Sequence, residues 1–308
     1  MNPKVAQKIA RMLKITGIIL LSFLFLGLVL FGIFSVKSHI FFKEVFEEPV
    51  EKTPMKIDTY GNPSNPSLLI LHGMYQDGGM MAHYGKALSD SYFVVIPTVH
   101  GMDGEQRAVF DSFDSECEYI EEFAKNNLGG KFDFAYGISM GATMIFHLLC
   151  RENVPVQKAI LDGLYLANQG KFSAYMVAKN YYEFHEKAIS GEDFDLGIMA
   201  FGCKMMGMSE EDAKDLFRNG LTKNHISLNN MARVALANYT YKASDDKIFE
   251  TEVALWCGSK EPYALKSNTI AKPHLAHYDE VIFDGYAHGE LVQKHTDECE
   301  QKIREFLR

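Results

Sequence analysis

A pentapeptide near the middle of the chain, Gly137-Ile138-Ser139-Met140-Gly141, decides the fold. The residues before it, 132–136, form a short aromatic run that is typical of a buried strand, and residues 142–149 after it are apolar with helical spacing. A serine in a tight turn between a strand and a helix is held in a strained backbone conformation that lifts its hydroxyl above the sheet edge. The flanking glycines let the strand and the helix pass closely, because a Cβ there would collide. Ser139 is therefore the candidate nucleophile.

Strand patterns recur on both sides of this turn. The predicted strands are residues 55–60, 67–71, 92–97, 132–136, 156–162, 252–257 and 280–284. Helical spacing at residues 80–88 and 115–127 separates several of them, and a terminal helix is predicted over residues 290–307. Strands that alternate with helices in this way predict an α/β fold, with a doubly wound, mostly parallel sheet and right-handed crossovers.

The alternation stops between about residues 165 and 250, where only helical patterns occur. Ser209, with Asp212 three residues later, predicts the start of one helix, and Ser227 predicts the start of another. Phe, Tyr and Met are frequent in this insertion. Such side chains either pack the insertion onto the main body or line an apolar pocket beneath a helical lid over the serine.

A serine hydroxyl attacks an acyl carbon only with a base, a group that orients the base, and amide donors for the oxyanion. His288 lies in a glycine-flanked loop after the last predicted strand and is the candidate base. Glu261, on the turn after the strand that follows the insertion, is the candidate orienting carboxylate. Asp162, at the end of the strand before the insertion, is the rival acid, and Asp284 is a third candidate.

The candidate oxyanion donors are two backbone amides. Met140 follows the serine at the start of the predicted helix, where amides lack intrahelical partners. Met74 follows His72-Gly73 at the end of a buried strand and supplies the second amide. We expect His72 itself to hold this loop rather than to take part in the chemistry.

The N-terminal segment has the pattern of a membrane anchor. Lys4, Lys8, Arg11 and Lys14 precede an uncharged stretch, residues 15–34, which as a helix would span about 30 Å, the thickness of a bilayer core. A cleaved signal peptide is the alternative, but its apolar part is usually about 7–15 residues and ends at a small-x-small site that is absent here. The positive-inside rule places the N-terminus in the cytoplasm and the catalytic domain outside it. The predicted parts are residues 1–14 (basic flank), 15–35 (transmembrane helix), 36–53 (juxtamembrane linker) and 54–308 (catalytic domain).

Composition excludes several classes of function. The chain has 308 residues, of which 47% are hydrophobic, so it can bury a sizeable core. Its net charge of −9 argues against binding to nucleic acid, which requires a basic face. The five cysteines follow no CxxC spacing, and Cys150 and Cys257 lie in apolar runs typical of small buried residues. No HExxH occurs and only His274 and His277 are close together, so we expect no metal site.

These segments together resemble the α/β-hydrolase family. The resemblance rests on LLILHGM (68–74), VVIPTVHG (94–101), FDFAYGISMGA (132–142), ALWCGSKE (254–261) and GYAHGEL (285–291), and covers about residues 54–308. It is strongest for members with a helical cap between the sixth and seventh strands, such as monoacylglycerol-lipase-like esterases and related serine peptidases. It implies a cap inserted after the sixth strand and hydrolysis through an acyl-enzyme. The chain departs from the family in using Glu261 where Asp is commoner, and Ile138 where a His often precedes the serine.

We therefore expect a membrane-anchored serine hydrolase that cleaves small-molecule carboxylic esters with apolar acyl groups and needs no cofactor. A triad does not distinguish esters from amides or thioesters, because the lid and the pocket select the acyl and leaving groups. A serine peptidase or thioesterase on the same fold is the alternative. A non-catalytic, ligand-binding member of the fold is a third possibility.

Overall fold

The computed structural model describes residues 3–47, 49, 53–104, 108–243 and 247–308. These residues form two compact units, Met1–Glu47 and Glu48–Arg308, and each is described by itself. Parts of the predicted basic flank (1–14), of the predicted linker (36–53) and of the predicted insertion (165–250) lie outside the described residues.

The first unit contains one long helix, α1 (Pro3–Val45). Its segment Arg11–Val45 is long and apolar enough to cross a membrane, by length and composition, although a signal sequence near the N-terminus meets the same criteria. The helix runs ten residues beyond the predicted span of residues 15–35, so the first part of the predicted juxtamembrane linker is helical.

The second unit is built on a mixed sheet. Its described strands are β1 (Ile57–Tyr60), β2 (Ser67–Leu71), β3 (Phe93–Pro97), β4 (Phe132–Ile138), β5 (Val156–Asp162), β6 (Phe249–Gly258) and β7 (Leu275–Phe283). They lie in the order β1-β3-β2-β4-β5-β6-β7. Only β1 is antiparallel to its neighbour in this sheet, and the other described pairs are parallel. The predicted doubly wound, mostly parallel α/β sheet is confirmed.

Helices cover both faces of this sheet, because successive side chains of its central strands point to opposite sides. In β2, Leu69 and Leu71 pack toward α3 (Phe113–Asn127) and α4 (Met140–Arg151), whereas Leu68 and Ile70 pack toward α2 (Ala82–Leu88) and α11 (Thr296–Leu307). All four residues are fully buried. The remaining short elements are η1 (Gly78–Met81), α9 (Pro262–Ala271), η2 (Lys272–His274) and α10 (Glu290–Lys294).

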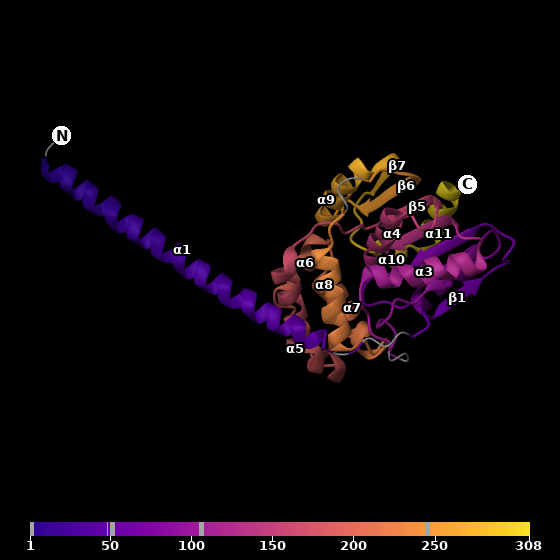
Figure 1. Cartoon of the computed structure of the whole chain (residues 1–308), viewed down its shortest axis with the longest axis horizontal. Coiled ribbons are helices and arrows are strands. Elements are labelled where there is room, and N and C mark those ends of the chain that lie inside the picture. Colours follow the sequence, from indigo (N-terminus) through magenta and orange to yellow (C-terminus); the bar gives the residue numbers. More distant parts are fainter. Residues whose placement is uncertain (1–2, 48, 50–52, 105–107, 244–246) are drawn as a thin grey trace. The chain divides into compact units, whose positions relative to one another are not determined.

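Four helices occupy the insertion and lie beside one another (Figure 1). They are α5 (Gly170–Ser190), α6 (Met199–Met205), α7 (Glu210–Thr222) and α8 (Leu228–Thr240). The predicted caps are confirmed, since the Ser209 hydroxyl accepts from the Asp212 amide at 3.0 Å and the Ser227 hydroxyl accepts from the Asn230 amide at 3.2 Å. The insertion follows β5, the fifth described strand in chain order, where the family pattern counts six.

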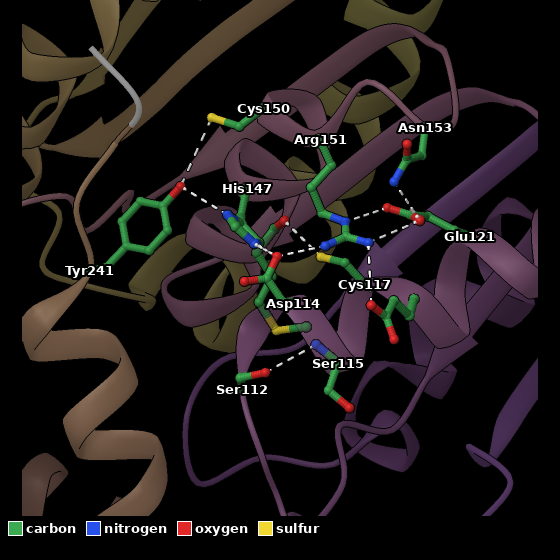
Figure 2. Close-up of polar contacts among 12 residues, drawn as sticks. Ser112, Asp114, Ser115, Cys117, Glu121, His147, Cys150, Arg151, Asn153 and Tyr241 are labelled. Carbon is green, nitrogen blue, oxygen red and sulfur yellow. Dashed lines mark hydrogen bonds and ion pairs between the residues drawn. The ribbon is translucent and has the colours of Figure 1, made fainter.

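A polar network joins α4 to α3 and to the end of the insertion (Figure 2). The Arg151 guanidinium donates to both carboxylate oxygens of Glu121, at 2.5 and 3.2 Å, and to Asp114 at 2.5 Å. His147 on the preceding turn lies 3.0 Å from Asp114, and its other ring nitrogen lies 3.4 Å from the Tyr241 hydroxyl. Because Tyr241 directly follows α8, this network ties the far end of the insertion to the helix that begins at the serine turn.

The prediction of one continuous terminal helix is wrong. The terminal helix is not continuous over residues 290–307, because His295 leaves the helical conformation (φ −124°, ψ 50°) between α10 and α11. Its ring stacks on Tyr286 with centroids 4.7 Å apart, a contact between residues nine positions apart that helical periodicity does not reveal.

Candidate active site

The serine turn joins β4 to α4 with a strained backbone. Ser139 has φ 57° and ψ −116°, outside the conformations that non-glycine residues usually adopt. A Cβ on Gly137 would lie 2.5 Å from the Gly141 carbonyl oxygen, and one on Gly141 would lie 2.3 Å from the Leu71 carbonyl oxygen. The two glycines are therefore required by the close passage of strand and helix. The Ser139 amide donates to the Asp162 carbonyl at 2.8 Å and fixes the turn against β5.

The other candidate residues follow neighbouring strands at the same edge of the sheet. Gly73 and Met74 come after β2, Glu261 comes after β6, and His288 comes after β7. The carboxyl ends of adjacent parallel strands meet at one edge, so the chain brings these segments together around the serine turn. A Cβ on Gly73 would lie 3.6 Å from the Ser139 Cβ.

The buried Glu261 and the partly buried His288 form a pair. The His288 Nδ1 lies 2.6 Å from Glu261 Oε2, and the Glu261 Oε1 accepts from the Gly258 amide at 2.6 Å. Burial disfavours the protonated imidazole, but the negative charge of Glu261 and its hydrogen bond outweigh this effect and raise the pKa of His288 above its ordinary value. With Nδ1 donating to the carboxylate, Nε2 is the ring nitrogen left to accept a proton.

The rival acids bond to partners other than His288. The Asp162 carboxylate is 4% exposed and accepts from the Tyr136 hydroxyl at 2.9 Å. Burial, together with the nearby charge of Glu261, raises the pKa of Asp162 to about 7. Asp284 accepts from the exposed Ser259 hydroxyl at 3.2 Å. Of the three sequence candidates, Glu261 is the one whose carboxylate meets the imidazole of His288.

The loop after β2 is held by its own side chains. His72 is fully buried; its Nδ1 lies 2.8 Å from the Gly73 carbonyl oxygen, and its Nε2 accepts from the Val99 amide at 3.1 Å. Burial lowers the pKa of His72, which stays neutral. The Gly73 amide donates to Gln76 Oε1 at 2.9 Å. These contacts agree with the expected structural role of His72 and fix the backbone that leads into Met74.

A cavity of about 320 Å³ opens above the serine turn. Ser139, Glu261, His288 and Met74 line it, together with apolar and aromatic side chains of α5, α6, α7 and α8. In the part of the chain that the structure describes, no hydrogen bond joins the Ser139 hydroxyl to His288. Such contacts are commonly long in ligand-free sites and tighten when substrate binds. The same described residues contain no group of three His, Cys, Asp or Glu side chains that could hold a metal ion.

Sequence reasoning missed two positions that shape this site. A Cβ on Gly163, which has φ 58°, would lie 2.7 Å from His288 Cε1, so only glycine leaves room for the imidazole. A glycine directly after the Asp162 strand end was the available signal. The His288 amide donates to the Met206 carbonyl at 2.9 Å, a contact with the end of α6 that sequence alone does not predict.

Comparison with known proteins places the chain in a family. Residues 66–288 match the alpha/beta hydrolase fold, and the chain belongs to this family. An alpha/beta hydrolase family protein from Desulfitobacterium hafniense superimposes with a TM-score of 0.72 at 21% identity, covering 82% of this chain and 100% of that chain. A thermophilic esterase from Thermogutta terrifontis has a TM-score of 0.64 at 16% identity, and the match covers 84% of this chain and 96% of the esterase. An enol-lactonase from Burkholderia xenovorans has a TM-score of 0.63 at 14% identity, and the match covers 84% of this chain and 98% of the lactonase. No curated protein matches the sequence.

Replacing the acid should change the titration of the imidazole. In Glu261→Gln the carboxylate charge that raises the pKa of His288 is lost while burial remains, so we expect this pKa to fall. The measurement is an NMR titration of the imidazole resonances, with the His288 signal assigned by its loss in His288→Gln. Asp284→Asn is the matched control and should leave the titration unchanged. An unchanged titration in Glu261→Gln would contradict the pairing.

Gly141→Ala should destabilise the fold by about 2–3 kcal/mol, because its methyl group would press on the backbone carbonyl of Leu71. Gly202→Ala in α6 is the control, since a Cβ there meets nothing within 4 Å, and helix propensity favours alanine by about 0.5–1 kcal/mol. Urea denaturation of both variants gives the comparison. Equal denaturation midpoints for Gly141→Ala and the wild type would refute the steric argument.

Proposed function

We propose that this member of the hydrolase family is a serine hydrolase that cleaves carboxylic esters through an acyl-enzyme on Ser139. The observation that carries the proposal is the 2.6 Å contact of Glu261 with His288 beside a strained serine turn in one cavity. A base oriented by a carboxylate in the same cavity as a serine is the arrangement that nucleophilic catalysis by serine requires.

The proposed reaction proceeds in two halves. The Ser139 Oγ attacks the ester carbonyl carbon while His288 Nε2 removes the hydroxyl proton, and Glu261 stabilises the imidazolium. The oxyanion accepts hydrogen bonds from the amides of Met74 and Met140. Collapse breaks the ester C–O bond, and the imidazolium returns its proton to the departing alcohol. Water then attacks the acyl-enzyme with the same base, and the carboxylic acid leaves as the proton returns to Ser139.

The proposal of an apolar substrate rests on the cavity. Most of its lining side chains are aliphatic, aromatic or methionine, and burying such a surface against an apolar acyl group is favourable. Phe172, Ile198 and Phe201 line the cavity and are 44%, 49% and 64% exposed, so apolar side chains reach the solvent at its mouth. We propose that the insertion helices act as the cap that selects the substrate.

We also propose that α1 anchors the protein in a membrane with the N-terminus in the cytoplasm and the catalytic domain on the other side. The support is the apolar segment Arg11–Val45 and the four basic residues, Lys4, Lys8, Arg11 and Lys14, that precede the uncharged stretch 15–34. An uncleaved anchor would keep the hydrolase at a lipid surface, where esters with apolar acyl groups are concentrated.

Ser139→Ala should lower the rate of ester hydrolysis by about a thousandfold or more, because the nucleophile is removed. The assay uses p-nitrophenyl esters of increasing chain length beside aminoacyl anilides, with fluorophosphonate labelling of the serine in parallel. Ser190→Ala is the control, since its hydroxyl bonds to Lys187 and Glu192 at the exposed end of α5. Full activity in Ser139→Ala would refute the mechanism, and a preference for anilides would indicate a peptidase.

The proposed topology predicts the behaviour of C-terminal reporters. Alkaline phosphatase fused after Arg308 should be active, because it folds only outside the cytoplasm, and green fluorescent protein fused there should be dark. Bright fluorescence with an inactive phosphatase would reverse the orientation. A fusion recovered in the soluble fraction at the size of a shortened chain would show that the helix is cleaved as a signal sequence.

A further inference from the structure

Two of the residues that line the cavity each carry a buried polar atom. The Tyr181 hydroxyl oxygen on α5 and the Asn238 Oδ1 on α8 are buried and have no hydrogen-bond partner among the residues that the structure describes. Their residues are 1% and 6% exposed, and both residues line the cavity. A folded protein satisfies nearly all of its buried polar atoms, so an unpartnered atom beside a cavity indicates a group that a ligand completes.

These two atoms lie toward different ends of the helix pair. The Gln169 amide donates to the Tyr239 carbonyl at 2.9 Å, and the Tyr182 hydroxyl donates to Asn229 at 2.7 Å, which sets α5 and α8 antiparallel. In this register, Asn238 lies about ten residues from the level of Tyr181, or roughly 15 Å at 1.5 Å per residue. A ligand that completes both groups is therefore elongated.

Neutral aromatic hydroxyls also line the cavity. The Tyr75 ring packs edge-on against Tyr181 with centroids 5.5 Å apart, and the Tyr239 ring lies 5.7 Å from that of Tyr165. Burial raises the pKa of the Tyr75 and Tyr239 phenols above the ordinary value, so both are uncharged at neutral pH. Such phenols donate and accept hydrogen bonds without attracting ions.

The charges at the cavity exclude ionic substrates. Among the described lining residues, Glu261 supplies the one carboxylate and His288 the one imidazole, and no Asp, Lys or Arg side chain contributes. A substrate carboxylate or phosphate would lose its hydration without a counter-charge, which is costly. A plain alkyl chain would instead leave Tyr181 and Asn238 unsatisfied. A hydroxyl group fits either orientation of the Asn238 amide, because it both donates and accepts.

Resting on the esterase activity proposed above, we propose that the substrate is an uncharged, elongated ester whose apolar body carries hydroxyl groups, and that Asn238 and Tyr181 bind these hydroxyls. This assigns both residues to substrate selection. A site built to hydrogen-bond a hydroxyl discriminates strongly against the analogue that lacks it, because its own polar groups are then left unpaired.

The test compares matched esters. On the acyl side the pair is p-nitrophenyl hexanoate and p-nitrophenyl 6-hydroxyhexanoate, and on the alcohol side it is hexyl acetate and 6-hydroxyhexyl acetate, followed by acid release. We expect kcat/KM to favour the hydroxylated member by about tenfold or more in at least one pair. A preference for the unsubstituted member, or equal rates, in both pairs would overturn the inference.

Variants assign the preference to residues. Tyr181→Phe and Asn238→Leu should each reduce the ratio of kcat/KM for the hydroxylated ester to that for the unsubstituted ester. Tyr182→Phe is the control and should keep this ratio, because the Tyr182 hydroxyl bonds to Asn229. Because the two buried atoms have no partner in the described part of the chain, we expect Tyr181→Phe and Asn238→Leu to keep or raise Tm. A lower Tm with an unchanged ratio would show a structural role and overturn the assignment.

The failure of this inference is distinguishable from failure of the proposed function. Hydrolysis of unsubstituted esters that depends on Ser139 but shows no hydroxyl preference would refute only the inference. Absence of Ser139-dependent hydrolysis of every ester in the set would refute the esterase activity itself.

Discussion

The fold depends on the close passage of α4 across the ends of β2 and β4. The space for a Cβ at Gly141 is already occupied by the carbonyl oxygens of Leu71 and His72, at 2.3 and 2.7 Å. This approach forces the left-handed conformation of Ser139 and directs its hydroxyl into the cavity. The buried strands and helices on both sides of the turn maintain this strain, so the packing energy of the core offsets the cost of the strained Ser139 backbone.

Much of this architecture could be predicted from sequence because it follows local patterns. β2 and β5 have the predicted bounds, since their apolar runs end at clear breaks: β2 at His72-Gly73 and β5 at Asp162-Gly163. The serine turn and the caps at Ser209 and Ser227 depend on residue types at fixed short spacings. The break at His295 depends on a ring contact with Tyr286, and β7 begins at Leu275, before its apolar run, because pairing with β6 extends it.

The candidate site divides in the same way. Glu261 and His288 were predicted from their places after strands, and the structure brings them into contact. The space that Gly163 leaves for the imidazole, and the unpartnered atoms of Tyr181 and Asn238, arise from packing between segments far apart in the chain. No spacing rule links these residues, because their relation exists only after the insertion has folded onto the sheet.

The hydrogen bond from the His288 amide to the Met206 carbonyl has a kinetic consequence. The loop that carries His288, the proposed general base, is joined by this bond to the residue that caps α6, so any displacement of α6 that admitted substrate would also pull on His288. Substrate entry and bond cleavage would then require different conformations, because the imidazole would regain its catalytic position only when α6 returns. With a coupling of this kind, we expect the movement of α6, and not bond cleavage, to be the step that limits turnover.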